Sequence, residues 1–284
     1  MIKIVTDSTC DVPADLLAKY DIRIAPINIQ FGQQTYREGI DISRDDFFAK
    51  LEDTIPTSSQ PSPGQFTETF QPLLDAGHSV LAITITTKLS GTYQSAELAK
   101  SMLPDADIQV WDSLSLSMGT GYQVLAAARA AERGWSMAEI LALLDPIRAG
   151  MHLYFTPATL KYLQRSGRVG KLAGALSSLL QVKPIIQVQD GTLEAFEKVR
   201  SRVGSLDRLV QLTERAVGTT EPVKLAIIHA KADAEAQALQ TRLQEHFHCV
   251  EMHVVELACS LTVHGGPGII GIISYNVVRN PIVG

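Results

Sequence analysis

Runs of apolar, β-branched residues alternate along the first half of the chain with segments whose apolar residues recur at helical spacing. Strands that alternate with helices in this way are typical of an α/β fold with a mostly parallel sheet. We therefore predict an amino-terminal α/β domain over residues 1–150. The strand-like runs are IKIVTD, IRIAPINI, SVLAITIT and IQVWDS, and a fifth run, HLYFTP, follows directly after residue 150.

Several helix starts in this half are marked by local sequence signals. Ser43, Ser62 and Ser136 each stand three residues before an Asp, Gln or Glu, which is the spacing of a capping box. Pro63 follows the second of these serines, at a position where the first turn of a helix tolerates proline. These signals predict that helices begin directly after the three serines.

The second half of the chain has a different pattern. After the helical segment PATLKYLQRSGRVGKLAGALSSLL, two alternating runs flank Asp190 and Gly191, a pair favoured in two-residue hairpin turns. Helices around residues 205–217 and 233–246 are each followed by a strand, VKLAIIHA and CVEMHVVEL. We therefore predict an α+β domain over residues 151–284, with an antiparallel arrangement of its strands.

The composition limits what this chain can bind. Its 284 residues are 45% hydrophobic, enough for cores that exclude water and enclose a ligand. A formal charge of −5 without blocks of like charge gives no electrostatic footprint for nucleic acid. No apolar run approaches about 18 residues, and the first residues are typical of a strand rather than a signal peptide. With three scattered cysteines, we expect a cytoplasmic protein without stable membrane insertion.

The stretch LSGT, residues 89–92, lies where an apolar run gives way to an amphipathic segment. A hydroxyl and free backbone N–H groups at a helix start, with the positive end of the helix dipole, suit an anion. Ser90, Gly91 and Thr92 are therefore candidate ligands of an anionic group. Because serine is among the commonest helix caps, a purely structural role for Ser90 stays open.

Two further stretches carry candidate chemistry. The polar, proline-rich segment 56–64 places Thr57 and Ser58 among turn-forming residues, and such loops often carry function. His264 precedes glycines that allow close approach of the backbone, and the apolar run after them could line a cavity. Ordinary turn chemistry and a structural histidine are the alternatives.

Seven stretches follow one another along nearly the whole chain. They are VTDSTCDVP, TSSQPSPGQF, LSGTYQSA, VWDSLSLSMGTG, TLKYLQRSGRVG, VKPII with DG, and HGGPG. In this order they resemble the DegV family of bacterial fatty-acid-binding proteins. The resemblance implies a two-domain fold with one long-chain fatty acid in the cleft between the domains, its carboxylate held by hydroxyls and a histidine.

Some DegV family members resemble binding subunits of a fatty acid kinase. In these, a separate ATP-dependent subunit phosphorylates the bound carboxylate, and the acyl-phosphate feeds phospholipid synthesis. The resemblance therefore implies a noncatalytic lipid carrier with a fatty acid and a kinase subunit as partners, and with no catalytic residue, metal or cofactor of its own.

The resemblance also implies which residues hold the carboxylate. The family usually has threonine where this chain has Ser58, so the neighbouring threonine is an alternative donor. The implied carboxylate-binding residues are Thr57, Ser58, Ser90, Gly91, Thr92 and His264.

Two arginines match further family positions. Arg200 in EKVRSR matches an arginine implicated in engaging the kinase subunit, and Arg168 matches the second half of a glycine-rich motif. Ser166 replaces a common glycine of that motif. Surface arginines that are merely solvated or salt-bridged are the alternative for both.

Three other functions fit the sequence less well. A hydrolase would use Ser90 as nucleophile and His264 as base, but HGGPG follows Ser90 instead of preceding a G-x-S-x-G elbow. For nucleotide binding, neither a GxxxxGK[ST] nor a GxGxxG motif follows a predicted strand. A metal site lacks any standard zinc spacing, although four residues in one short region are potential ligands: His246, His248, Cys249 and His253.

Overall fold

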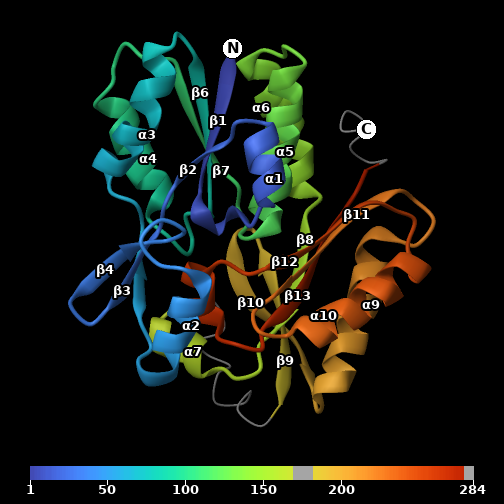
Figure 1. Ribbon diagram of the computed structural model, residues 1–284. Helices are drawn as coiled ribbons and strands as arrows, with labels where there is room; N and C mark the ends of the chain where they lie inside the picture. Colours follow the sequence, from blue (N-terminus) through green and yellow to red (C-terminus); the bar gives the residue numbers. More distant parts are fainter. Residues whose placement is uncertain (169–181, 278–284) are drawn as a thin grey trace. The chain divides into compact units, whose positions relative to one another are not determined.

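The computed structural model describes residues 1–168 and 182–277 (Figure 1). Contacts divide the chain into two compact units. The first unit comprises Met1–Asp145 together with Ala258–Val263, and the second comprises Pro146–Leu257 together with the chain from His264 onward. The chain thus returns briefly to the first unit near its end. A single boundary at residue 150 does not describe this return.

The first unit contains a four-stranded parallel sheet in the order β2-β1-β6-β7. Strand β6 is buried from its second residue to its end, as expected for a parallel strand covered on both faces. The predicted parallel sheet is therefore confirmed. Its strands are β1 (Ile2–Asp7), β2 (Arg23–Ala25), β6 (Ser79–Thr84) and β7 (Ile108–Asp112).

Helices cover both faces of this sheet (Figure 1). On one face, phenylalanines of α3 and alanines of α4 pack against Val5, Val80 and Ala82 of the strands. Helix α5 packs against β1 and β6, and its side chains are buried almost throughout. The helices of this unit are α1 (Ala14–Lys19), α2 (Arg44–Asp53), α3 (Pro63–Asp75), α4 (Thr92–Ser101), α5 (Met118–Glu132) and α6 (Met137–Ala149), with a 3-10 turn η1 (Ser8–Cys10).

The helix starts predicted from the capping signals are confirmed. Ser43 accepts a hydrogen bond from the backbone N–H of Asp46 at the start of α2. Ser62 and Gln65 form a reciprocal capping box at the start of α3. Ser136 and its Glu partner form the corresponding pair of bonds directly before α6.

A three-stranded antiparallel sheet, β4-β3-β5, completes the first unit. It comprises β3 (Asn28–Phe31), β4 (Gln34–Arg37) and β5 (Thr57–Ser59). Two predictions were wrong here. IRIAPINI forms β2 and β3 in different sheets, because Pro26 cannot donate to a ladder and interrupts the run. The start of the segment expected to be a loop is an edge strand, β5.

The second unit is built on a six-stranded sheet in the order β10-β9-β8-β13-β11-β12. All neighbouring pairs are antiparallel except β11 and β12, which are parallel. The sheet is therefore mixed, and the expected antiparallel arrangement fails for that pair. The strands are β8 (His152–Thr156), β9 (Lys183–Gln189), β10 (Thr192–Val199), β11 (Val223–His229), β12 (Cys249–Glu256) and β13 (Ile270–Asn276).

The hairpin between β9 and β10 is confirmed. Asp190 and Gly191 have φ values of 49° and 78°, as the two central residues of a type I′ turn require. The strand β13 was not predicted, since its sequence GIIS follows a glycine-rich turn and is buried on both faces, which removes the alternating pattern.

Two long helices cover one face of this sheet (Figure 1). They are α9 (Arg202–Val217) and α10 (Asp233–His246), and they pack on side chains such as Leu225, Ile227 and Ile272. Because side chains alternate along a strand, the other face carries a second set of buried apolar residues. These are Leu153, Phe155, Ile186, Ile228 and Ile273. Two short helices, α7 (Lys161–Ser166) and α11 (Cys259–Gly265), complete the described elements.

Candidate functional site

The loops after β1 and β6 lie at the carboxyl end of the parallel sheet. The chain places β2 on one side of β1 and β6 on the other, which makes the β1/β6 boundary a topological switch point. Ligands of open α/β sheets bind outside the carboxyl ends of the strands at such points. Asp7 ties the two strand ends together, since its carboxylate accepts the N–H of Ile85 at 2.8 Å.

Ser90 lies in the loop that leads from β6 into α4, as predicted. Its Oγ accepts the backbone N–H of Thr92 at 3.3 Å and lies 2.7 Å from Thr92 Oγ1. Gly91 is the residue directly before the helix and has no side chain with which to cap it. Ser90 thus stands one residue before the N-cap position of α4, and its hydroxyl accepts the N–H of the first helical residue. It is half-buried.

The register of β5 distinguishes between the two neighbouring candidate hydroxyls. Ser58 pairs with Ile29, which is fully buried, whereas Thr57 pairs with Gln30. Directly paired residues point to the same face of a sheet. Ser58 is half-buried on the face of Ile29, and Thr57 is exposed. The geometry therefore favours Ser58 over Thr57 as the hydroxyl of an enclosed site.

A contact between Gln60 and Gly91 brings the two hydroxyl-bearing segments together. A Cβ atom at Gly91 would lie 2.8 Å from Nε2 of Gln60, so glycine leaves room for the glutamine side chain. Asn28 supports the same segment through hydrogen bonds to Gln65, the capping partner of Ser62. The predictions did not single out Gln60, although it stands within the quoted motif TSSQPSPGQF.

His264 lies near the carboxyl end of α11. Burial, and to a smaller extent the charge of Arg168, lowers the pKa of His264 to about 4. The imidazole is therefore neutral near pH 7 and has one N–H donor and one acceptor nitrogen. Such a donor suits a carboxylate without adding a buried charge.

The glycines after His264 are required by close contacts. Gly266 has a φ of 77°, and a Cβ there would lie 2.3 Å from the ring of Tyr162. Gly268 has a φ of 80°, and a Cβ there would lie 2.7 Å from that of Ala158. The backbone of HGGPG therefore lies directly against the segment that joins β8 to α7.

Arg202 holds the end of this turn, a role that the predictions missed. Its Nη2 donates to the carbonyl oxygen of Gly268 at 2.7 Å and to Glu235 at 2.5 Å. The only signal in the sequence was its position two residues after Arg200. Because the guanidinium forms several directed bonds at once, it fixes the turn more firmly than a single bond would.

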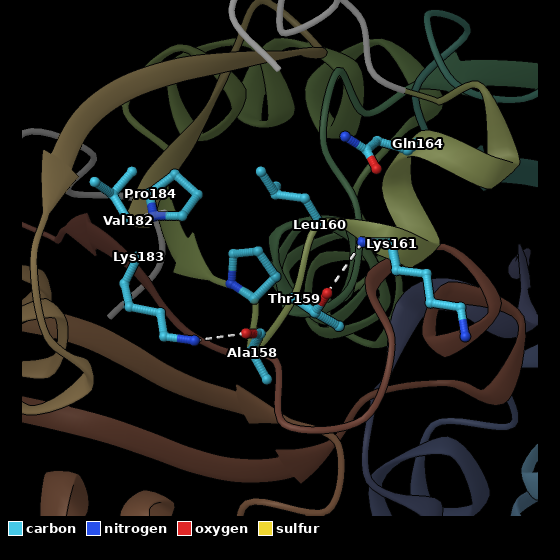
Figure 2. Close-up of a pocket in the computed structure, with 9 residues that line it drawn as sticks. Ala158, Thr159, Leu160, Lys161, Gln164, Val182, Lys183 and Pro184 are labelled. Atoms are coloured by element: carbon cyan, nitrogen blue, oxygen red, sulfur yellow. Dashed lines mark hydrogen bonds between the residues drawn. The ribbon is translucent and has the colours of Figure 1, made fainter. Parts of the chain in front are cut away.

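A pocket of about 210 Å³ adjoins the same segment of the second unit (Figure 2). Nζ of Lys183 donates to the carbonyl oxygen of Ala158 at 2.7 Å, and the amine of Lys161 points away from the hollow (Figure 2). Ligand pockets commonly enclose about 300–1,000 Å³, so this one is smaller than a typical ligand site. Its lining includes Pro157, Leu160, Gln164, Val182 and Pro184.

The remaining sequence candidates have ordinary surroundings. Ser166 ends α7 in helical backbone that any residue adopts, and Gly167 provides the left-handed residue after it. Arg168 is exposed and donates to the carbonyl oxygen of Ser166. Arg200 is exposed directly before α9.

The histidines considered as metal ligands have other partners. His246 lies 3.0 Å from Glu214, His253 lies 2.9 Å from Glu251, and His248 contacts a backbone carbonyl. Within residues 1–168 and 182–277, no group of three His, Cys, Asp or Glu side chains is placed to hold a metal ion.

Sequence comparison identifies the family. The family model described as "Uncharacterised protein, DegV family COG1307" matches residues 1–277. This chain belongs to the DegV family. It is 32% identical to a DegV domain-containing protein of Caldanaerobacter subterraneus, over 95% of this chain and 97% of that protein.

Solved structures of DegV proteins share the fold. A DegV family protein from Thermus thermophilus, described as fatty acid binding, has a TM-score of 0.91 at 32% identity, covering 97% of this chain and 99% of that one. A stearic-acid-binding protein from Eubacterium ventriosum has a TM-score of 0.89 at 28% identity and covers 99% of each chain. The two-part α/β fold predicted from the DegV resemblance is thus confirmed.

The hydrolase alternative gains no support from the DegV comparisons or from the site. Ser90 Oγ is engaged with Thr92, as a structural hydroxyl at a helix start would be.

Among the helices that the structure describes, none combines the length and apolar character needed to cross a bilayer.

Proposed function

We propose that this chain binds one long-chain fatty acid and presents its carboxylate to a separate ATP-dependent kinase subunit. The observation that carries the first part is its similarity, over 97% of its length, to a DegV structure described as fatty acid binding. The stearic-acid-binding relative from Eubacterium ventriosum supports the ligand class.

The acyl chain supplies most of the binding free energy. At about 0.8 kcal/mol per buried CH₂, a chain of ~16 carbons gains on the order of 10 kcal/mol before ordering and association costs.

Uncharged donors orient the carboxylate in this proposal. Ser58 and Ser90 supply hydroxyls, and the neutral imidazole of His264 supplies an N–H. Each hydrogen bond to a charged acceptor contributes about 1.5–3 kcal/mol. Gly91 and Thr92 shape the loop that carries Ser90, and Thr57 is the less favoured alternative to Ser58.

The second part of the proposal, presentation to a kinase, rests on the resemblance to binding subunits of fatty acid kinase. The chain has no GxxxxGK[ST], and its one GxGxxG pattern, GPGIIG at 266–271, follows helix α11 and leads into strand β13 rather than joining a strand to a helix, so ATP would be bound by the partner. The acyl-phosphate would then enter phospholipid synthesis.

Native mass spectrometry of the protein purified from a bacterial host tests lipid binding directly. We expect about one fatty acid per chain, because burial of the tail makes dissociation slow. Mild extraction and mass spectrometry then identify chain length and unsaturation. Methyl palmitate serves as a control ligand that has the tail without the charged head. A protein that arrives empty and takes up neither palmitate nor oleate would rule out a carrier function.

A further inference from the structure

Helix α11 ends at the turn that contains the candidate histidine. It runs from Cys259 to Gly265 and carries His264 one residue before its end. Ser260 and His264 are four residues apart, so their side chains lie on one face of the helix, one turn apart. The helix is only about 10 Å long. Whatever holds its first turn therefore also constrains the orientation of its last turn.

A single buried carboxylate holds that first turn. Oε1 of Glu38 accepts the backbone N–H of Ser260 at 2.9 Å, and its Oε2 accepts the Ser260 hydroxyl at 2.7 Å. The hydroxyl of Ser8 donates to Oε2 as well, at 2.5 Å. Glu38 is 9% exposed and Ser260 2% exposed. Both oxygens of the carboxylate are thus used, and its charge complements the amino end of the helix.

Glu38 is itself anchored in the first unit. Its backbone N–H donates to the carbonyl oxygen of Ile27 at 2.9 Å, and the N–H of Ile27 donates to Oγ of Ser8 at 3.0 Å. A second carboxylate acts on the preceding residue, since Asp11 accepts the N–H of Ala258 at 2.8 Å. The start of α11 is therefore attached to the segment after β1 and to the beginning of β3.

Burying the Glu38 carboxylate costs folding free energy, although the helix that it holds has only two turns. Burial raises the pKa of Glu38, and the nearby charge of Asp7 raises it further. A buried carboxylate is retained only when its hydrogen bonds compensate for lost hydration. Apolar packing could hold a short helix in place at lower cost, whereas the two hydrogen bonds that Ser260 donates to one carboxylate fix both the position and the rotation of the first turn.

We propose that Glu38 is a positioning residue for the fatty-acid carboxylate: through Ser260 it fixes α11 and thereby the direction in which His264 presents its N–H. The proposal rests on the proposed role of His264 in binding the carboxylate. Nothing in the sequence motifs indicates it, because Glu38 and Ser260 are 222 residues apart.

A double-mutant cycle on stearate binding tests this coupling. Glu38→Ala and His264→Ala should each weaken binding by roughly tenfold or more. The double variant should bind no more weakly than His264→Ala alone, because a positioning residue acts only through the group it positions. Leu73→Ala, in the core between α3 and the sheet, controls for lost stability. If the loss of stearate affinity in the double variant equals the product of the two single losses, the proposal is overturned.

A conservative variant and a ligand-free measurement complete the test. Glu38→Gln keeps an acceptor for Ser260 N–H and donates to the two hydroxyls, so affinity should return to within about threefold of wild type. In the ligand-free protein, Glu38→Ala should shift the ring ¹⁵N resonances of His264, and Glu38→Gln should largely restore them. Unchanged ring resonances in Glu38→Ala would overturn the positioning role. If Glu38→Ala does not fold, Ser260→Ala replaces it with the same expectations.

The measurement on the ligand-free protein also tests this inference independently of the proposed function. A wild-type protein that fails to bind stearate would refute the carrier function. The ring resonances would then still decide whether Glu38 positions His264.

Discussion

At the scale of single residues, Ser90 shows that a helix cap and a ligand contact are compatible. A hydroxyl has one donor and two acceptor positions. Ser90 Oγ accepts the N–H of Thr92, and Thr92 Oγ1 lies 2.7 Å away as a second hydrogen-bonding partner. If Thr92 donates in that pair, the Ser90 proton is free for a carboxylate. The two interpretations of Ser90 that the sequence left open are therefore not exclusive.

Alanine variants of Ser90 and His264 should separate binding from presentation. Each variant removes one hydrogen bond worth about 1.5–3 kcal/mol, whereas roughly 10 kcal/mol of tail burial remains. We expect lipid to be retained on purification but acyl-phosphate formation with a saturating kinase subunit to fall, because a misplaced acceptor oxygen loses in-line geometry. Ser101→Ala, at the other end of α4, is the control. Wild-type yields from both variants would show that these residues are only structural.

The buried carboxylate of Asp11 should make stability depend on pH. Burial raises its pKa to about 8, against about 3.9 in an unfolded chain. Between these values the folded state binds more protons, so its contribution to stability is complete below about pH 4 and is lost as the pH rises towards 8. Asp11→Asn cannot ionise and suits the left-handed backbone of this residue (φ 51°). Relative to wild type, the variant should gain at most about 1.4 kcal/mol per pH unit.

Urea unfolding of both proteins from pH 5 to pH 8 measures this difference. Asp41→Asn is the matched control, because its hydrogen bonds to Arg37 lower the pKa of Asp41 to about 2. The contribution of Asp41 is lost only as the pH falls below about 4, outside the measured range. Parallel curves for wild type and Asp11→Asn would show that Asp11 does not titrate in this way.

At the scale of elements, short sequence signals correctly predicted those helix starts and turns that depend only on neighbouring residues. Serine caps located the starts of α2, α3 and α6, and Asp190-Gly191 located the β9–β10 hairpin. The pairing of β5 with β3 and the return of residues 258–263 to the first unit depend on partners far along the chain. No periodicity within one segment encodes such partners, so these features were missed.

The candidate site shows the same difference between local and long-range information. Ser58, Ser90 and His264 could be named as candidates because their motifs are local and match a family pattern, and their role in binding stays a prediction. Gln60, Arg202 and Glu38 act through contacts to Gly91, Gly268 and Ser260, which appear only when the chain is folded.

The turn after α11 should be more sensitive to substitution than an ordinary helix end. Gly266→Ala adds backbone strain of about 1–2 kcal/mol and places a methyl group against the ring of Tyr162. Gly167→Ala, after α7, adds similar strain at a φ of 69° with no atom within 4 Å of the new Cβ. The first variant should therefore unfold at a lower urea concentration than the second. Equal losses would mean that the Tyr162 contact has no influence on stability.

At the scale of the whole molecule, one surface feature bears on how the lipid would be delivered. Arg200 is exposed between β10 and α9, close in sequence to two exposed apolar side chains, Phe196 at 42% and Val203 at 70%. Exposed apolar and charged side chains both occur in protein interfaces. In the function proposed above, the partner at this surface would be the kinase subunit.

Arg200→Glu tests whether docking is separate from lipid binding. Stearate affinity should remain unchanged, because Arg200 lies at the surface. Acyl-phosphate formation at limiting kinase subunit should fall by roughly three- to tenfold at low salt, since rim charges mainly alter association. Raising the ionic strength should shrink the difference. Arg242→Glu makes the same charge reversal at an exposed position on α10 and should leave both measurements near wild type. If Arg200→Glu lost stearate to the same extent as activity, Arg200 would belong to the lipid site or the folded core, and docking would have to use another surface.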